Sequence, residues 1–191
     1  MNLPNKISTL RLILIPVFAL LFYIDFSGHF IAAAAVFAVA AFTDFLDGYV
    51  ARKYDLVTDL GKFLDSSADK VLVLSALVLL LDKGLIPEIF GGVMTSLILA
   101  REIMISCLRM IAAAKNEVIQ ADKLGKIKTL LQDVALVILI VAGGVRAVWL
   151  LWTGVGLLAL SVVMAVVSGF HYLVKYRYVL TGAADKDGKK A

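Results

Sequence analysis

The sequence predicts an all-α integral membrane protein, a bundle of six transmembrane helices with a polar cavity at the cytoplasmic side. The 191-residue chain is 61% hydrophobic, with a mean hydropathy of +0.93, whereas soluble domains are usually about 45–50% apolar. Its apolar residues fall into six segments. Its charged residues gather at one end of these segments, which predicts a bundle that is apolar in one half and polar in the other.

Each of the six segments is long enough to be one membrane-spanning helix, which needs about 20 residues. The segments are roughly Ile7–Ile24, His29–Ala51, Gly61–Leu81, Pro87–Ala114, Ile127–Val145 and Ala147–Val174. The uninterrupted apolar runs inside them are shorter, because aspartate, lysine and arginine side chains occupy one half of several segments. Charged residues within a membrane span are candidates for function, because they are costly to place there.

The distribution of positive charge predicts the orientation. With a cytoplasmic N-terminus, six spans place the C-terminus on the same side, and all but Lys83 and Arg146 of the 19 lysines and arginines fall there. The net charge of +4 therefore indicates a lipid surface and a topology signal, with no nucleic-acid partner. We expect one membrane domain over residues 1–180 and a disordered polar tail over residues 181–191.

Four aspartates form the densest group of charge in the chain. Asp44 and Asp47 are three residues apart, and Asp65 and Asp69 are four apart, so each pair lies on one face of its helix. Four converging carboxylates would repel one another without a cation between them. Carboxylate oxygens are ligands for hard divalent cations, so the spacing predicts one or two Mg²⁺ or Mn²⁺ ions.

The residues around the aspartates suggest a phosphate-containing substrate. Gly48 and Gly61 allow a ligand to approach the backbone closely, and the guanidinium of Arg52 can bind phosphate oxygens through two parallel hydrogen bonds. Metal, carboxylates and arginine together indicate phosphoryl or phosphatidyl transfer. The alternative is a small cation transporter. The acids gather at one membrane face, however, and no charged series continues to the other.

The pattern Asp44-x2-Asp47-Gly48-x2-Ala51-Arg52-x8-Gly61-x3-Asp65-x3-Asp69 resembles, at all eight fixed positions, the signature of the CDP-alcohol phosphatidyltransferases. The resemblance implies a six-helix membrane fold and a homodimer. It also implies that Asp44, Asp47 and Asp65 are the core metal ligands, and that Asp69 joins the metal site and acts as general base. The residues implied to bind the CDP-lipid are Asn5, Gly48, Ala51, Arg52, Thr58 and Gly61.

Blocks on both sides of the signature are similar to those of family members that use glycerol 3-phosphate as acceptor. They include Pro4-Asn5-x3-Thr9-x-Arg11, Arg101-Glu102-Ile103 and Gly125-Lys126-x-Lys128-Thr129. The pair Ser66-Ser67 departs from these members, which usually have proline followed by an apolar residue there. The resemblance implies that CDP-diacylglycerol is the donor and that CMP leaves.

Four cations near the aspartates support an acceptor that carries its own phosphate. These candidate acceptor-phosphate ligands are Arg101, Arg109, Lys126 and Lys128. Glycerol 3-phosphate fits this charge, inositol phosphate fits it nearly as well, and serine would require fewer cations. The competing interpretation is structural: the arginines would pair with Glu102 or another acid, and the lysines would serve only as positive-inside residues.

Overall fold

The computed structural model describes residues 3–53, 59–115, 119 and 123–181; at residues 3–6, 44–53, 59–60, 62, 123 and 180–181 it describes the backbone alone. These residues form seven helices and no β-strand, so the predicted all-α class is confirmed. The helices are α1 (Leu3–Leu21), α2 (His29–Lys53), α3 (Asp59–Asp82), α4 (Glu88–Ala114), α5 (Lys123–Val145), α6 (Val148–Lys175) and α7 (Arg177–Thr181).

The first six helices match the six apolar segments to within four residues at each end. Helix α1 continues through Pro16, as expected where neighbouring helices can satisfy a freed carbonyl. Helix α3 ends at a left-handed Gly84, and the N–H of Leu85 donates to the carbonyl of Leu80 at 2.9 Å. Helix α7 was not predicted, because five residues are too few to show a helical period.

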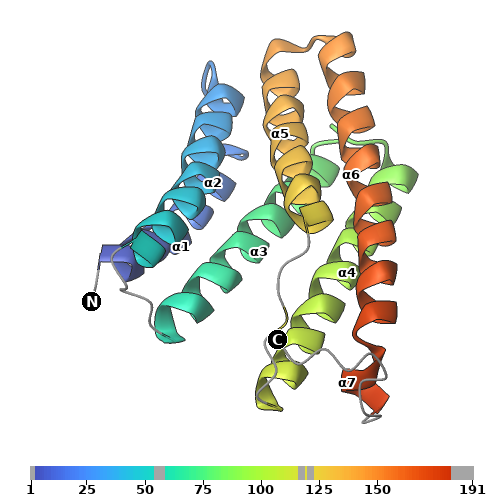
Figure 1. Ribbon diagram of the computed structural model, residues 1–191. Coiled ribbons are helices and arrows are strands. Elements are labelled where there is room, and N and C mark those ends of the chain that lie inside the picture. The colour runs from blue at the N-terminus through green and yellow to red at the C-terminus, as the bar shows by residue number, and fades with distance from the viewer. Residues whose placement is uncertain (1–2, 54–58, 116–118, 120–122, 182–191) are drawn as a thin grey trace.

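The helices form two lobes that share α3 (Figure 1). Helices α1 and α2 lie side by side in one lobe, and α5 and α6 form an antiparallel pair in the other. Helix α3 runs obliquely from the first lobe toward the second, where α4 packs against α6. The turns between α1 and α2 and between α5 and α6 lie at the upper end of Figure 1, whereas α7 lies at the lower end.

The main core joins the two lobes in the apolar half of the bundle. Phe18 of α1, Phe22 in the turn after α1 and Phe37 of α2 are almost fully buried, and Phe18 makes an edge contact with Phe22 at 5.2 Å between ring centroids. Leu77 of α3 and Leu139 of α5 belong to the same cluster. A second, smaller cluster connects α4, α6 and α7 near the lower end of the molecule.

The outer surface is strongly apolar. Phe170 of α6 is 70% exposed, and Ile89 of α4 and Leu130 of α5 are also largely exposed. Soluble proteins rarely leave such extensive apolar surface uncovered. Among the described residues, Leu124–Val145 and Val148–Lys175 are long and apolar enough to cross a membrane, and Ile7–Leu21 and His29–Thr43 are shorter apolar helices. The count of six spans remains a prediction.

Two glycines on α6 provide a matched test of the α5–α6 contact. A Cβ added at Gly154 would lie 2.7 Å from Cγ of Leu139, whereas one at Gly156 would meet nothing within 4 Å. Both changes to alanine remove the same helix-propensity penalty. We therefore expect Gly154→Ala to be less stable than Gly156→Ala by about 1–3 kcal/mol through overpacking. Thermal unfolding in detergent measures the difference, and equal melting temperatures would contradict this packing.

Candidate active site

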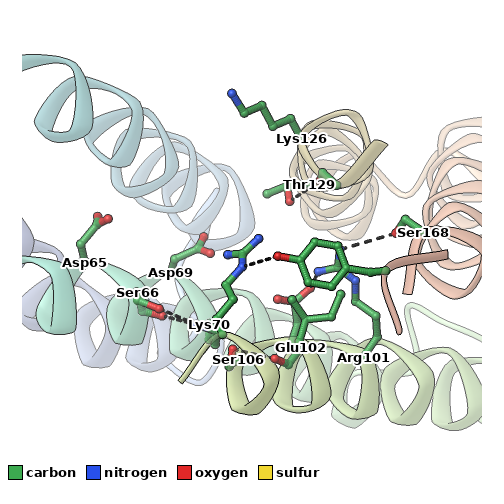
Figure 2. A pocket seen from close by; sticks show the side chains of 14 residues that line it. Asp65, Ser66, Asp69, Lys70, Arg101, Glu102, Ser106, Lys126, Thr129 and Ser168 are labelled. Carbon is green, nitrogen blue, oxygen red and sulfur yellow. Dashed lines mark hydrogen bonds and ion pairs between the residues drawn. The ribbon is translucent and has the colours of Figure 1, made fainter. Parts of the chain in front are cut away.

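A cavity of about 400 Å³ opens between α3, α4, α5 and α6. It is lined by Asp65, Ser66, Asp69, Lys70, Arg101, Glu102, Ile105, Ser106, Arg109, Gly125, Lys126, Thr129, Ser168 and Tyr172. Two of the four predicted aspartates therefore share one cavity with three of the four predicted acceptor-phosphate ligands. Figure 2 shows the labelled aspartates at one side of this cavity and Arg101, Glu102 and Ser168 at the other.

The acidic side of the cavity is a face of α3. Asp65 and Asp69 are one helical turn apart, and both line the cavity, as their spacing predicted. The guanidinium of Arg11, which is fully buried in α1, donates to Oδ1 of Asp65 at 3.3 Å. This ion pair connects α1 to the acidic face and restrains the Asp65 carboxylate. A contact across 54 positions of sequence could not be predicted from the local pattern.

The basic side is organised by one carboxylate. Arg101 donates through Nη1 to Oε1 of Glu102 at 2.9 Å, and Lys128 of α5 donates to the same oxygen. Lys128 is only 2% exposed, lines a separate small cavity and does not line the main one. Glu102 therefore joins α4 to α5 and balances much of the charge that Arg101 and Lys128 bring to this region.

Arg109 occupies a different environment from Arg101. Its Nε donates to the hydroxyl of Tyr172 on α6 at 3.1 Å, and its guanidinium carbon lies 5.6 Å from the centre of the Tyr172 ring. The contact with Tyr172 therefore combines a hydrogen bond with a cation–π interaction. Lys126, the remaining predicted cation, is exposed at the rim and points away from the other labelled side chains (Figure 2).

The other predicted site residues lie outside the described side chains. Helix α2 carries the backbone of Asp44, Asp47, Gly48, Ala51 and Arg52, and α1 carries that of Asn5. Thr58 falls outside the described residues altogether. Gly61 lies in α3, one turn before Asp65. The roles of these residues in metal and CDP-lipid binding stay predictions.

Among the described side chains, no group of three or more histidines, cysteines, aspartates and glutamates could hold a metal ion. The described part of the predicted centre contributes Asp65 and Asp69. Their carboxylates offer only oxygen donors, the kind that Mg²⁺ and Mn²⁺ prefer. Two such groups on one cavity-lining face fit a divalent cation, and the other predicted ligands, Asp44 and Asp47 of α2, lie outside the described side chains.

Sequence reasoning did not assign Arg11, Ser168 or Tyr172 to the site, and considered Glu102 only as a counter-charge. Arg11 and Glu102 had a visible signal, since each is a charged residue in an apolar segment. Ser168 and Tyr172 had none, because serine and tyrosine are common in membrane helices. Their place becomes evident only when α6 packs against α4.

Comparisons with known proteins show the family of this chain. The family model described as CDP-alcohol phosphatidyltransferase matches residues 1–173. A CDP-diacylglycerol–glycerol-3-phosphate 3-phosphatidyltransferase of Rickettsia typhi is 41% identical over 90% of this chain and 94% of its own length. Proteins of the same name are 37% identical in Escherichia coli, over 90% of this chain and 93% of their own, and 42% identical in Bacillus subtilis, over 70% and 74%.

The match covers every described helix of the bundle except α7 and the last residues of α6. It includes the aspartate faces, the cavity and the apolar core between the lobes. Together with its long apolar helices, the match identifies a membrane protein. The chain belongs to the CDP-alcohol phosphatidyltransferase family, and the cavity between α3, α4, α5 and α6 contains its candidate active site.

Proposed function

We propose that this protein transfers the phosphatidyl group of CDP-diacylglycerol to sn-glycerol 3-phosphate, giving phosphatidylglycerophosphate and CMP. The observation that carries this proposal is the single cavity in which carboxylates of α3 face arginines of α4. In a reaction between two phosphate-bearing substrates, the carboxylates can hold metal ions for one phosphate group and the arginines can bind the other directly. The names of relatives at 37–42% identity support glycerol 3-phosphate over inositol phosphate or serine as acceptor.

The donor would bind at the acidic side. Asp44, Asp47, Asp65 and Asp69 would hold one or two Mg²⁺ or Mn²⁺ ions, which supply positive charge to a diphosphate when bound. Arg52 would add a guanidinium to the same phosphates. Asn5, Gly48, Ala51, Thr58 and Gly61 would surround the CDP moiety, and the lipid tails would stay in the bilayer.

The acceptor would bind at the basic side, with its phosphate on Arg109 and Arg101 and with Lys126 at the rim. Its 1-hydroxyl oxygen attacks the β-phosphorus of CDP-diacylglycerol, the bond from this phosphorus to the CMP oxygen breaks, and Asp69 takes the hydroxyl proton. The position of Asp69 on the cavity wall, on the side of Asp65 nearer to Arg101, supports this role. Lys128 is better suited to a structural role, because it is buried against Glu102.

We further propose the multi-span arrangement and orientation that the charge distribution predicts. The cavity, the C-terminal end of α4 and α7 would face the cytoplasm, and the turns near Lys83 and Arg146 would face the opposite side. A homodimer, as the family resemblance implies, remains part of the proposal. This orientation would open the cavity to the side where the water-soluble substrate glycerol 3-phosphate and the water-soluble product CMP are found.

The reaction itself is tested with purified protein, CDP-diacylglycerol and radiolabelled glycerol 3-phosphate. We expect chloroform-soluble label and equimolar CMP with Mg²⁺, none after chelation with EDTA, and recovery when Mg²⁺ is restored. Asp69→Asn should lower kcat at least about a hundredfold, because it removes the proton acceptor. Asp82→Asn, at the other end of α3, is the matched control. Absence of product, or full activity of Asp69→Asn, would refute the proposal, and greater turnover of serine or inositol phosphate would refute the acceptor.

Arg11 should tune the metal site through Asp65. Arg11→Lys keeps the charge and loses the planar group that contacts Asp65 at 3.3 Å. Groups that hold a metal ligand typically change metal affinity by about 10–100-fold when altered. We expect the Mg²⁺ concentration for half-maximal activity to rise by such a factor, with saturating Mg²⁺ restoring most of the rate. An unchanged Mg²⁺ requirement would show that the ion pair does not position Asp65.

Arg109 should act on the acceptor alone. In Arg109→Ala, we expect the KM for glycerol 3-phosphate to rise about 10–100-fold, as for loss of a charged phosphate contact. The KM for CDP-diacylglycerol should change less than twofold. Lys83→Ala removes a cation from the opposite end of the bundle and should alter neither constant. An unchanged acceptor KM in Arg109→Ala would remove Arg109 from the site.

A further inference from the structure

Helix α6 contributes an uncharged surface directly behind the two cavity arginines. Ser168, Gly169 and Tyr172 lie on one side of this helix, and each meets an arginine of α4. Ser168 and Tyr172 are at most 3% exposed. Neither the aspartate signature nor the proposed reaction assigns a role to these residues.

Tyr172 determines which part of Arg109 is available to a ligand. Its hydroxyl accepts from Nε at 3.1 Å, and its ring lies under the guanidinium. With Nε held, the two terminal amino groups form the edge that can bind a phosphate in a bidentate manner. Tyr172 is itself supported by Tyr176, whose ring centroid lies 4.8 Å away. An arginine held in this way loses less side-chain entropy when a ligand binds.

Gly169 and Ser168 define the path of Arg101. A Cβ added at Gly169 would lie 3.2 Å from Cγ of Arg101, and one added at Gly125 of α5 would lie 3.3 Å from its Nη2. The hydroxyl of Ser168 lies 3.5 Å from the same Nη2, at the limit of hydrogen bonding. Arg101 therefore passes between α5 and α6 at a point where both helices have a glycine, and a Cβ on either glycine would make a tight contact with its side chain.

We propose that Ser168, Gly169 and Tyr172 are positioning residues that make α6 the element specifying a phosphorylated acceptor. They hold Arg109 and Arg101 in place, so that both guanidiniums can bind the phosphate of the acceptor with a smaller loss of side-chain entropy. This inference rests on the proposed function, because it takes the two arginines as the acceptor-phosphate site. Tyr172 contributes more to this positioning than Ser168, because its hydrogen bond with Arg109 is shorter than the contact of Ser168 with Arg101. The Tyr172 ring also contacts the guanidinium.

The test is a kinetic comparison of Tyr172→Phe with Tyr176→Phe, which removes a hydroxyl at the C-cap of α6, outside the cavity. Tyr172→Phe should raise the KM for glycerol 3-phosphate about five- to tenfold, which is within the usual effect of losing one ordinary hydrogen bond. The inhibition constant for inorganic phosphate should rise in parallel. The kcat and the KM for CDP-diacylglycerol should stay within twofold of wild type, and Tyr176→Phe should resemble wild type throughout.

A double-mutant cycle separates positioning from general damage. Added to Arg109→Ala, Tyr172→Phe should cause no further rise in the acceptor KM, because the residue acts through Arg109. A persistent rise in that background overturns the proposal. So does an unchanged acceptor KM in Tyr172→Phe, or an equal rise in the KM of both substrates. If wild-type protein makes no lipid product, the proposed function has failed; if it does and Tyr172→Phe matches it, only this inference has failed.

Gly169→Ala gives a second and independent variant, with Gly156→Ala as its control on the same helix. The new Cβ should displace the stem of Arg101 by a few tenths of an ångström, whereas Gly156 has open space around it. We expect the acceptor KM to rise about two- to fivefold in Gly169→Ala only, with melting temperatures of the two variants within a few degrees. Identical acceptor KM values in both variants would exclude Gly169 from the positioning set.

Discussion

The structure depends on ion pairs that balance buried positive charges inside an apolar bundle. An unpaired ion in such surroundings costs several kcal/mol, so a buried cation is retained only next to an acid that balances it. Glu102 meets this need for Arg101 and Lys128 at once, and Asp65 meets it for Arg11. These pairs connect α4 to α5 and α1 to α3. The same contacts that neutralise the charges therefore set the positions of the helices that enclose the cavity.

This pairing leaves a cavity that is acidic on one side and basic on the other. Two phosphate-bearing substrates repel each other, so an enzyme that joins them must neutralise each one separately. Carboxylates cannot hold a diphosphate directly, which explains why the proposed donor side needs divalent cations. In the proposed reaction, the terminal amino groups of Arg109 would neutralise the acceptor phosphate. Asp69 lies between the two regions, where the acceptor hydroxyl would meet the donor phosphorus.

Sequence alone predicted the helices well because hydropathy and helix length act locally. It also predicted that Asp65 and Asp69 share one face, since their spacing equals about one helical turn. The roles of the four cations were harder to predict, because nothing in the local sequence distinguishes Arg101, Arg109, Lys126 and Lys128 as candidate phosphate ligands. The structure separates them through contacts that are distant in sequence: Lys128 meets Glu102 across 26 positions, and Arg109 meets Tyr172 across 63. No periodicity carries information on pairs that form only when helices pack.

Helix α6 illustrates why such contacts cannot be predicted from the sequence. It is the most apolar of the long helices, and its residues near the cavity are small or aromatic, as in any closely packed membrane helix. The residues of α6 that pack against α4 are nevertheless the same residues that would position the arginines. Gly169 leaves room for the stem of Arg101 because it lacks a side chain, and Tyr172, three residues later on the same helix, lies within hydrogen-bonding distance of Arg109. In the proposed site, acceptor recognition therefore depends on uncharged residues of α6 as well as on the arginines that they hold in place.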